Sequence, residues 1–144
     1  MEILNEMGSL LVCPAIAFLR GDRMLIGLRH YTPDKWKTIS AWTIPGGRCD
    51  EGEHIEETLR REVAEETGIK KFSITDFLGK VPGAKEGDVV YLFKGITDGE
   101  PKLMEPEKFS EWKWESIDSL PEGYINPAQI PLVRDSLKKK MNHE

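Results

Sequence analysis

The chain has 144 residues and a formal net charge of −5, with 39% hydrophobic and 31% charged residues. This length suits one hydrophobic core, so we expect a single domain over residues 1–144. The composition is that of a folded protein and excludes a disordered chain. The negative charge argues against general nucleic-acid binding, which requires a basic surface. No apolar run approaches the roughly 20 residues that cross a membrane.

The first part of the chain predicts three strands that lead to a Pro-Gly-Gly sequence. Leu10–Arg20 is apolar and predicts a strand, and the next two residues predict a hairpin turn. Arg23–Arg29 is almost continuously apolar, which is typical of a strand buried on both faces. His30–Ser40 is polar and contains a proline, so we interpret it as a loop. Ala41–Ile44 predicts a short strand that ends at the glycine pair.

The remaining chain predicts a helix, three strands and a second helix. The first helix extends from about Glu53 to Thr67, and Gly68 supplies the residue type that commonly ends a helix. The later elements follow from apolar runs and turn residues: strands at 72–79, 88–97 and 111–115, a loop at 81–87, and a helix from Pro127 to about Lys140 that Asn126 caps. This order indicates an α/β layered fold.

The two cysteines, Cys13 and Cys49, have no metal-ligand spacing. Cys13 lies in an apolar strand, where we expect it to be a small core residue. We do not expect a disulfide bond. The N-terminus lacks a basic region followed by an apolar segment, so we expect no signal peptide. A reducing, cytoplasmic location is therefore our expectation.

The predicted first helix carries one apolar stripe, formed by Ile55, Leu59 and Val63. At about 100° per residue, Glu66 falls within this stripe and Glu62 lies at its edge. A carboxylate beside a core is unfavourable unless a cation or an arginine compensates its charge. These two glutamates are therefore candidate ligands of a buried cation.

Glu57, Arg61 and Glu65 fall on the other side of the helical wheel, toward solvent. Helix positions three or four residues apart share a face, so Glu65 still lies close to Glu62. Hard cations such as Mg²⁺ bind carboxylate oxygens together with water and substrate phosphates. The acidic cluster at the end of the helix therefore predicts a metal site.

The stretch from Gly47 to Ile69 resembles the Nudix box, Gly-x5-Glu-x7-Arg-Glu-apolar-x-Glu-Glu-x-Gly-apolar, over 23 of the 144 residues. The matching residues are Gly47, Glu53, Arg61, Glu62, Val63, Glu65, Glu66, Gly68 and Ile69. Weaker resemblance extends to Trp42–Gly47 before the box and to Glu111–Trp114 after it. The resemblance implies a Nudix hydrolase, which cleaves a nucleoside diphosphate linked to another group. It also implies the Nudix α/β/α sandwich, with a mixed β-sheet between the box helix and a C-terminal helix.

The resemblance implies a role for each charged residue of the box. Glu62 and Glu66 would bind Mg²⁺, or Mn²⁺ in its place, and the carbonyl of Gly46 would be a backbone ligand. Glu65 would bind a second metal ion or act as the catalytic base. The pair of Glu53 and Arg61 would orient the other members through a charge-assisted hydrogen bond. For the arginine, a surface pair with Glu57 remains the alternative.

The family usually adds one more carboxylate from a loop after the box. Glu105, Glu107 and Glu111 compete for this role. We favour Glu107 as the catalytic residue because it stands shortly before the predicted Trp112–Trp114 strand. The alternative for each is a solvated loop glutamate.

Aromatic side chains could stack on a nucleobase. Tyr31, Trp36, Trp42 and Trp112 are the candidates. Trp36 is the best of them because it lies in a polar segment. Trp42 and Trp114 lie in strand patterns, which favours the core.

In the branch of the family that cleaves oxidised guanine nucleotides, an amide at the start of the last helix reads the base. Pro127–Pro131 resembles that segment, with Gln129 where asparagine is expected. Our expected substrate-binding set is completed by Arg29, Trp36 and Gly47.

Motifs of the coenzyme A, NADH, ADP-ribose and diadenosine polyphosphate branches are absent from the expected places. By elimination, we expect hydrolysis of a nucleoside triphosphate to the monophosphate and pyrophosphate. The alternatives are a hydrolase of a nucleotide sugar or a dinucleotide, and a non-catalytic nucleotide-binding module. We expect a nucleotide as the partner, with no nucleic acid and no membrane, and a homodimer is compatible with the sequence.

Overall fold

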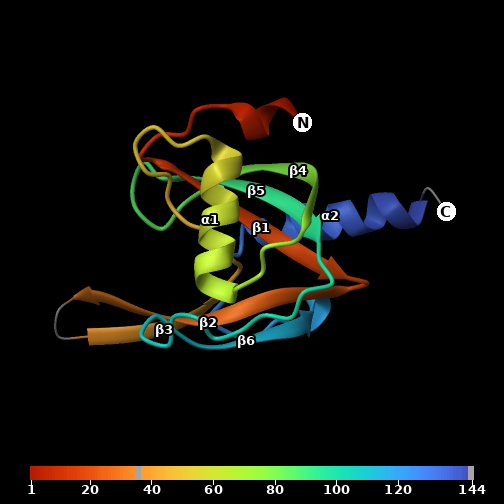
Figure 1. The fold of residues 1–144 in the computed structure, drawn as a ribbon. Helices are drawn as coiled ribbons and strands as arrows, with labels where there is room; N and C mark the ends of the chain where they lie inside the picture. Colours follow the sequence, from red (N-terminus) through yellow and green to blue (C-terminus); the bar gives the residue numbers. More distant parts are fainter. Residues whose placement is uncertain (35–36, 143–144) are drawn as a thin grey trace.

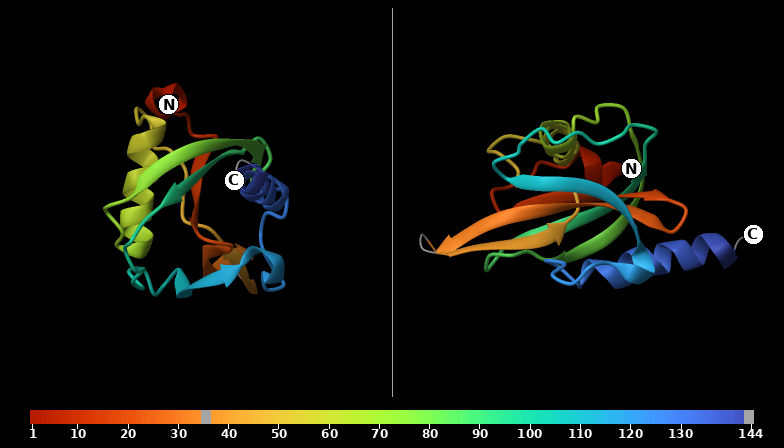
Figure 2. Two further views of the ribbon diagram at one scale, coloured as in Figure 1. Left: turned by 90° about the vertical axis from the view of Figure 1, so that its right-hand side faces the viewer. Right: turned by 90° about the horizontal axis from the view of Figure 1, so that it is seen from below.

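Two helices cover opposite faces of a six-stranded mixed sheet (Figures 1 and 2). The computed structural model describes residues 1–34 and 37–142. The strands are β1 (Val12–Arg20), β2 (Arg23–Asp34), β3 (Lys37–Thr43), β4 (Ser73–Pro82), β5 (Val89–Ile96) and β6 (Phe109–Ser116). The helices are α1 (Ile55–Thr67) and α2 (Gln129–Asn142), with 3-10 turns η1 (Glu2–Asn5) and η2 (Ile117–Ser119). The predicted α/β/α sandwich is confirmed.

The sheet has the strand order β3-β2-β1-β5-β4, and β6 pairs with the other edge of β2. Among the described strands, β1 and β5 pair in parallel, and the remaining pairs are antiparallel. β1 and β2 pair only beside their connecting turn, where Leu19 lies opposite Met24. Beyond that point the two strands diverge, which leaves an edge of β1 open for another segment.

The chain that follows β3 occupies this open edge of β1. The N–H of Ile16 donates to the carbonyl of Pro45 at 3.0 Å, and the N–H of Gly47 donates to the carbonyl of Pro14 at 3.1 Å. The Pro-Gly-Gly sequence is therefore held in an extended form against the centre of the sheet. Its position brings the glycine pair beneath α1.

The alternation of side chains along β1 separates two cores. Ile16 and Phe18 lie in the core beneath α1, whereas Ala17 and Leu19 lie in the core beneath α2. The predicted apolar stripe of α1 is confirmed, because its three members are almost fully buried: Ile55 (1% exposed), Leu59 (0%) and Val63 (0%). The stripe fixes which face of α1 meets the sheet and thereby positions the acidic residues.

The prediction that His30–Ser40 forms a loop is wrong. β2 continues to Asp34 and β3 begins at Lys37, so this segment is mostly a two-stranded ribbon that projects beyond the cores (Figure 1). His30 lies opposite Ser40, and their side chains are 2.7 Å apart between Nδ1 and Oγ. Cross-strand backbone hydrogen bonds stabilise such a ribbon even where its side chains are polar. A prediction based on apolar patterns therefore does not detect it.

The boundaries near the C-terminal helix also differ from the prediction. β4 extends to Pro82, which lies opposite Val89, and so shortens the predicted loop. α2 begins at Gln129 instead of Pro127. The expected capping of α2 by Asn126 stays a prediction, and the Nδ2 of this side chain donates to the carbonyl of Pro82 at 2.8 Å. This bond attaches the start of α2 to the end of β4.

Both cysteines are free thiols. Cys49 is buried, and a side chain on Gly8 would overlap its sulfur. Cys13 is half-buried beside the α2 core, in line with the expected small core residue. In the part of the chain that the structure describes, no helix combines the length and apolarity needed to cross a bilayer.

Candidate functional site

Glu66 is the buried carboxylate of α1, with 3% of its surface exposed. Its Oε1 accepts a hydrogen bond from the backbone N–H of Gly46 at 2.9 Å. Burial raises the pKa of Glu66 to about 8, and the nearby charge of Glu62 adds to this effect. The hydrogen bond from Gly46 and the positive charge of Arg29 act in the opposite direction. The position therefore favours either a proton or a bound cation.

Glu62 lies directly over the second glycine of the pair. A Cβ on Gly47 would be only 2.6 Å from Glu62 Oε2. A side chain larger than hydrogen at this position would displace the carboxylate, so the glycine makes room for it. Burial raises the pKa of Glu62, although Arg61 lowers it. The two carboxylates and the extended glycine loop thus converge at one place.

Arg61 holds the acidic residues in register through a forked set of ion pairs. Its Nε and Nη2 each lie 2.8 Å from an oxygen of Glu53, and its Nη1 lies 3.0 Å from Glu62 Oε1. Hydrogen bonds from Arg61 lower the pKa of Glu53 to about 2. Glu65 lies at 3.3 Å from the same Nη1. The alternative pair of Arg61 with Glu57 is wrong, because Glu57 is exposed and pairs with His54.

The loop before β6 brings one glutamate to this site. Glu105 is partly buried, and its charge contributes to the raised pKa of Glu66. Lys108 lies 3.4 Å from Glu105, and its charge also lowers the pKa of Glu62. Glu107, which we favoured from the sequence, is exposed. Its charge is not among the main influences on the pKa of Glu66. Glu111 is exposed as well.

The donor set suits a hard divalent cation. Glu62 and Glu66 offer carboxylate oxygens and Gly46 offers a carbonyl, which leaves positions for water and phosphate, as Mg²⁺ prefers. A cation here would compensate the buried carboxylate of Glu66, which accepts a hydrogen bond from the backbone N–H of Gly46. Among the described residues no three acidic, histidine or cysteine side chains form a complete cage. Arg61 instead forms ion pairs with Glu62 and with Glu65.

Arg29, which we expected to bind substrate, lies beside the acidic cluster at the end of the β2 core segment. Its guanidinium lies 4.9 Å from the centroid of the Tyr31 ring and 5.7 Å from that of Phe109. Its Nε is buried and has no hydrogen-bond partner among the residues that the structure describes. The positive charge of Arg29 acts to lower the pKa of Tyr31 and the pKa of Glu66. This cation and its two aromatic neighbours form a wall that adjoins the carboxylates.

Gln129, the expected base-reading amide, is buried with 4% of its surface exposed. The hydroxyl of Tyr124 donates a hydrogen bond to its Oε1 at 2.7 Å. Burial raises the pKa of Tyr124, and so does the neighbouring Tyr31. The Gln129 side chain is therefore held by Tyr124 at the start of α2. Tyr124 was not predicted from the sequence, because its contact with Gln129 depends on the turn between it and α2.

The other aromatic candidates divide between the core and positions that are not described. Trp36 lies outside the described residues. Trp42 packs against the α2 core, and Trp112 and Trp114 pack against the α1 core. The guanidinium of Arg20 lies over the ring of Trp114, 4.0 Å from the ring centroid. Tyr31 is thus the aromatic candidate that the structure places beside the acidic cluster.

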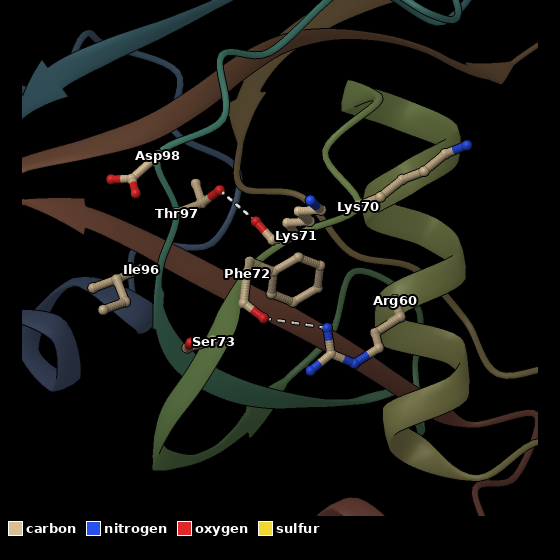
Figure 3. A pocket seen from close by; sticks show the side chains of 8 residues that line it. All are labelled: Arg60, Lys70, Lys71, Phe72, Ser73, Ile96, Thr97 and Asp98. Carbon is tan, nitrogen blue, oxygen red and sulfur yellow. Dashed lines mark hydrogen bonds between the residues drawn. The ribbon is translucent and has the colours of Figure 1, made fainter.

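A cavity of about 420 Å³ lies on the other flank of α1 (Figure 3). Arg60 reaches across it to the segment just before β4, where its Nη1 donates to the carbonyl of Phe72 at 3.3 Å. Its guanidinium also lies 4.6 Å from the centroid of the Phe72 ring. None of the carboxylates of the acidic cluster lines this cavity. This cavity and the acidic face are therefore separate features of the same helix.

The fold and site define a layered α/β protein in which helix α1 presents carboxylate oxygens of the kind that bind divalent cations. Comparison with known families agrees, because the NUDIX domain model matches residues 12–136. The chain belongs to the NUDIX family of hydrolases.

Individual relatives differ in what they act on. A protein of Bacillus subtilis strain 168 that is assigned as an 8-oxo-dGTP diphosphatase is 34% identical over 106 residues, or 74% of this chain and 64% of that protein. The NAD-capped RNA hydrolase NudC of Mannheimia succiniciproducens is 33% identical over 141 residues, covering 92% of this chain and 51% of that protein. The chain thus spans between half and two thirds of the length of these two relatives.

The fold also matches solved structures. The crystal structure of a MutT NUDIX hydrolase from Burkholderia pseudomallei superposes with a TM-score of 0.66 and 26% sequence identity. The match covers 84% of this chain and 94% of that one. The predicted Nudix-type sandwich is confirmed by this likeness.

Proposed function

We propose that the chain is a divalent-metal-dependent hydrolase that converts a nucleoside triphosphate to the monophosphate and pyrophosphate. The observation that carries this proposal is the buried carboxylate of Glu66, held by Gly46 and placed beside Glu62. A carboxylate buried as deeply as Glu66 is unfavourable unless a proton or a cation compensates its charge, and this supports a functional role for it. The oxygen donors suit Mg²⁺, with Mn²⁺ as a substitute.

The chain's own residues would divide the work as follows. Glu62, Glu66 and the carbonyl of Gly46 would hold the cation, which when bound supplies an activated water and a clamp on the phosphates. Arg61, itself fixed by Glu53, would keep the Glu62 carboxylate aimed at the glycine loop. Gly47 would admit that carboxylate and give the substrate close access to backbone.

The proton released by the attacking water needs an acceptor near the cation. Glu65 is held by Arg61 at 3.3 Å and is half-exposed, so it can accept a proton or bind a second cation. Glu105 is the better placed of the loop glutamates because its charge already acts on Glu66. We therefore propose Glu105, in place of Glu107, as the additional carboxylate of the site.

Substrate contacts would come from the wall beside the cluster. Arg29 offers a buried Nε that has no partner within residues 1–34 and 37–142, and such a donor suits an oxygen of the substrate. Tyr31 offers a ring for stacking, and Gln129 offers an amide for the base. The 8-oxo-dGTP diphosphatase activity assigned to the Bacillus subtilis relative agrees with a triphosphate substrate.

A substrate panel with Mg²⁺, read by product chromatography, tests the proposal. We expect a triphosphate to give one monophosphate and pyrophosphate, and excess chelator to abolish the reaction. Two monophosphate products would favour a nucleotide sugar or dinucleotide. Because one relative acts on NAD-capped RNA, the panel should include capped and 5′-triphosphorylated RNA. Binding without turnover of any substrate would favour a nucleotide-binding module.

A further inference from the structure

Arg48 lies in the glycine loop (residues 45–49), and its side chain forms a forked ion pair with Asp88, just before β5. Its Nη1 and Nη2 lie 2.7 Å and 2.6 Å from the two carboxylate oxygens of Asp88. The same Nη1 donates to the carbonyl of Leu10 at 2.6 Å. The Asp88 side chain is only 5% exposed. A bidentate pair of this kind fixes direction as well as distance.

The ion pair spans the start of β1 on the sheet face opposite the acidic cluster. The glycine loop lies along one edge of β1, where Gly46 pairs with Ala15, and β5 lies along the other edge. Alternation along an extended segment places Arg48 on the side of Ala15, which belongs to the core beneath α2. Gly47 faces the other way, because a Cβ there would overlap the Glu62 carboxylate. The loop is thus anchored from the side of α2 and meets the carboxylates on the side of α1.

The composition of the glycine loop explains why it needs an anchor. Glycines offer no side chain to pack on the sheet and weaken extended structure through their conformational freedom. Two backbone hydrogen bonds attach the second half of the loop to β1: the Gly47 N–H donates to Pro14 at 3.1 Å, and the Cys49 N–H donates to Val12 at 2.9 Å. Arg48 lies between these two donors, so its ion pair opposes separation of the loop from β1.

The backbone of Arg48 also contacts the charged network of α1. Its carbonyl accepts a hydrogen bond from Arg61 Nη2 at 3.4 Å, and the same arginine pairs with Glu62. A shift of the loop at this point would move the glycine pair relative to the carboxylates that it faces. It would also remove the bond to Arg61. The position of Arg48 is therefore coupled to both sides of the acidic cluster.

We propose that Arg48 and Asp88 are positioning residues whose ion pair holds the glycine loop where the cation site requires it. This inference rests on the proposed function and adds two residues that touch neither the cation nor the substrate. The pair would act through the carbonyl of Gly46, the backbone ligand of the proposed site. Residues that support metal ligands from behind commonly alter metal affinity or activity by about 10–100-fold.

Amide hydrogen exchange in chelator measures the attachment of the loop without metal or turnover. Asp88→Asn preserves side-chain size and breaks the ion pair. Exchange of the Gly47 and Cys49 amides should become about tenfold faster or more, because the loop opens more often once a charged hydrogen bond is lost. Amides in the middle of α1 should keep their rates. Arg48→Lys keeps the charge without the fork, so its rates should fall between those of wild-type protein and Arg48→Gln.

A single variant leaves one charged partner unpaired, and an unpaired charge at a shielded position is itself disruptive. The double variant Arg48→Gln/Asp88→Asn removes both charges and separates the two causes. If the ion pair positions the loop, exchange at Gly47 and Cys49 should remain fast in the double variant. Val133→Ala is the matched control for a general loss of stability, because Val133 is buried in the core beneath α2. It should affect protected amides throughout the sheet and not select the loop.

Binding of Mn²⁺ alone connects the loop to the cation site. The electron paramagnetic resonance signal of the free ion gives the affinity. The double variant should bind Mn²⁺ about tenfold more weakly than wild-type protein, and Val133→Ala should bind it with unchanged affinity where it is folded. Turnover of the double variant should fall strongly at limiting metal and much less at saturating metal, because the ligands themselves are retained.

The outcomes distinguish the inference from the proposed function. Wild-type exchange at Gly47 and Cys49 in the double variant, or wild-type affinity of that variant for Mn²⁺, would each overturn the inference. Triphosphate turnover by wild-type protein would be unaffected in both cases, and the proposed function would stand. Faster exchange and weaker Mn²⁺ binding in the double variant, without triphosphate turnover by wild-type protein, would support the inference and overturn the proposed function. No Mn²⁺ binding by wild-type protein would overturn both.

Discussion

The carboxylate of Glu66 and the backbone N–H of Gly46 meet at 2.9 Å, although the two residues belong to a helix and to an extended loop. The loop is held by β1, and the helix is held by the apolar stripe that packs on the same sheet. The core therefore positions both the helix that bears Glu66 and the loop that contains Gly46. Such support from rigid elements is what a precise cation site requires.

Replacement of Leu59 by Ala tests the packing of α1. Leu59 is fully buried in the core beneath the helix. Its truncation should lower the free energy of unfolding by about 2–5 kcal/mol, as large-to-small changes in cores usually do. Urea unfolding provides the measurement. Leu103→Ala is the matched control, because Leu103 is 45% exposed and its truncation should cost about 0.5 kcal/mol or less. Equal effects of the two changes would show that the stripe is not the buried face.

The ion pair of Glu53 and Arg61 predicts a defined dependence of stability on pH. The pKa of Glu53 is lowered from 4.5 to about 2 in the folded protein, chiefly by hydrogen bonds from Arg61. A carboxyl whose folded pKa is depressed stabilises the fold above its unfolded pKa and loses that contribution as pH falls toward the folded value. Glu53→Gln should therefore lower the free energy of unfolding at pH 7, and the difference from wild-type protein should shrink between about pH 4.5 and pH 2.

Urea unfolding in chelator at several pH values measures this difference without a bound metal. Glu51→Gln serves as the control because Glu51 is exposed and lies in the same loop. Its pH profile should follow that of wild-type protein. A constant gap between Glu53→Gln and wild-type protein at every pH would contradict the linkage.

The periodicity of α1 could be predicted from sequence because it depends on neighbours within one helix. Ile55 and Leu59 share a face whatever the rest of the chain does. The spacing of Glu62 and Glu66 within the box follows from the same local geometry. These parts of the site were therefore accessible before the fold was known.

Features that depend on contacts between distant segments were not accessible. The ribbon formed by β2 and β3 was predicted as a loop because backbone pairing, and not an apolar pattern, sustains it. The choice between Glu105 and Glu107 depends on how the loop enters β6, where Phe109 is buried. Tyr124 was missed because nothing in its local sequence shows that its hydroxyl reaches Gln129.

The small size of Gly47 should be necessary for the cation site. Gly47→Ala places a methyl group within 2.6 Å of Glu62 Oε2 and should displace that carboxylate. We expect a weaker apparent affinity for Mg²⁺ and turnover reduced at least about tenfold, since misplaced ligands lose transition-state stabilisation. Comparison with Glu62→Ala and with the double variant isolates the cause. If the two changes act through the same carboxylate, the double variant should be no worse than Glu62→Ala, and fully additive losses would disprove this account.

A pair of variants distinguishes the two loop glutamates. Glu105→Gln should lower kcat about 100-fold or more if its carboxylate accepts the proton from water, which is the usual contribution of a general base. Glu107→Gln should have a much smaller effect because the Glu107 side chain is exposed. The measurement compares the initial rates of the two variants with that of wild-type protein at saturating Mg²⁺. A larger loss for Glu107→Gln would restore that residue to the site.

The most direct test of the cation site is a comparison of Glu66→Gln with Glu57→Gln. Glu66→Gln preserves volume and can still accept the hydrogen bond from Gly46, but it removes the charge that a hard cation requires. Glu57→Gln removes a charge on the solvent side of the same helix and keeps the capping pattern with His54. The first variant should lose turnover by orders of magnitude, and its melting temperature without metal should hold or rise because a buried charge is removed.

The measurement is turnover of the best substrate at saturating Mg²⁺, with melting temperatures recorded with and without the metal. The account predicts that Glu66→Gln loses turnover and its stabilisation by Mg²⁺, while Glu57→Gln retains both. Near-normal turnover in Glu66→Gln together with lost turnover in Glu57→Gln would show that the cation site has been assigned to the wrong face of α1. Near-normal turnover in both variants would contradict the assignment of this helix as the catalytic centre.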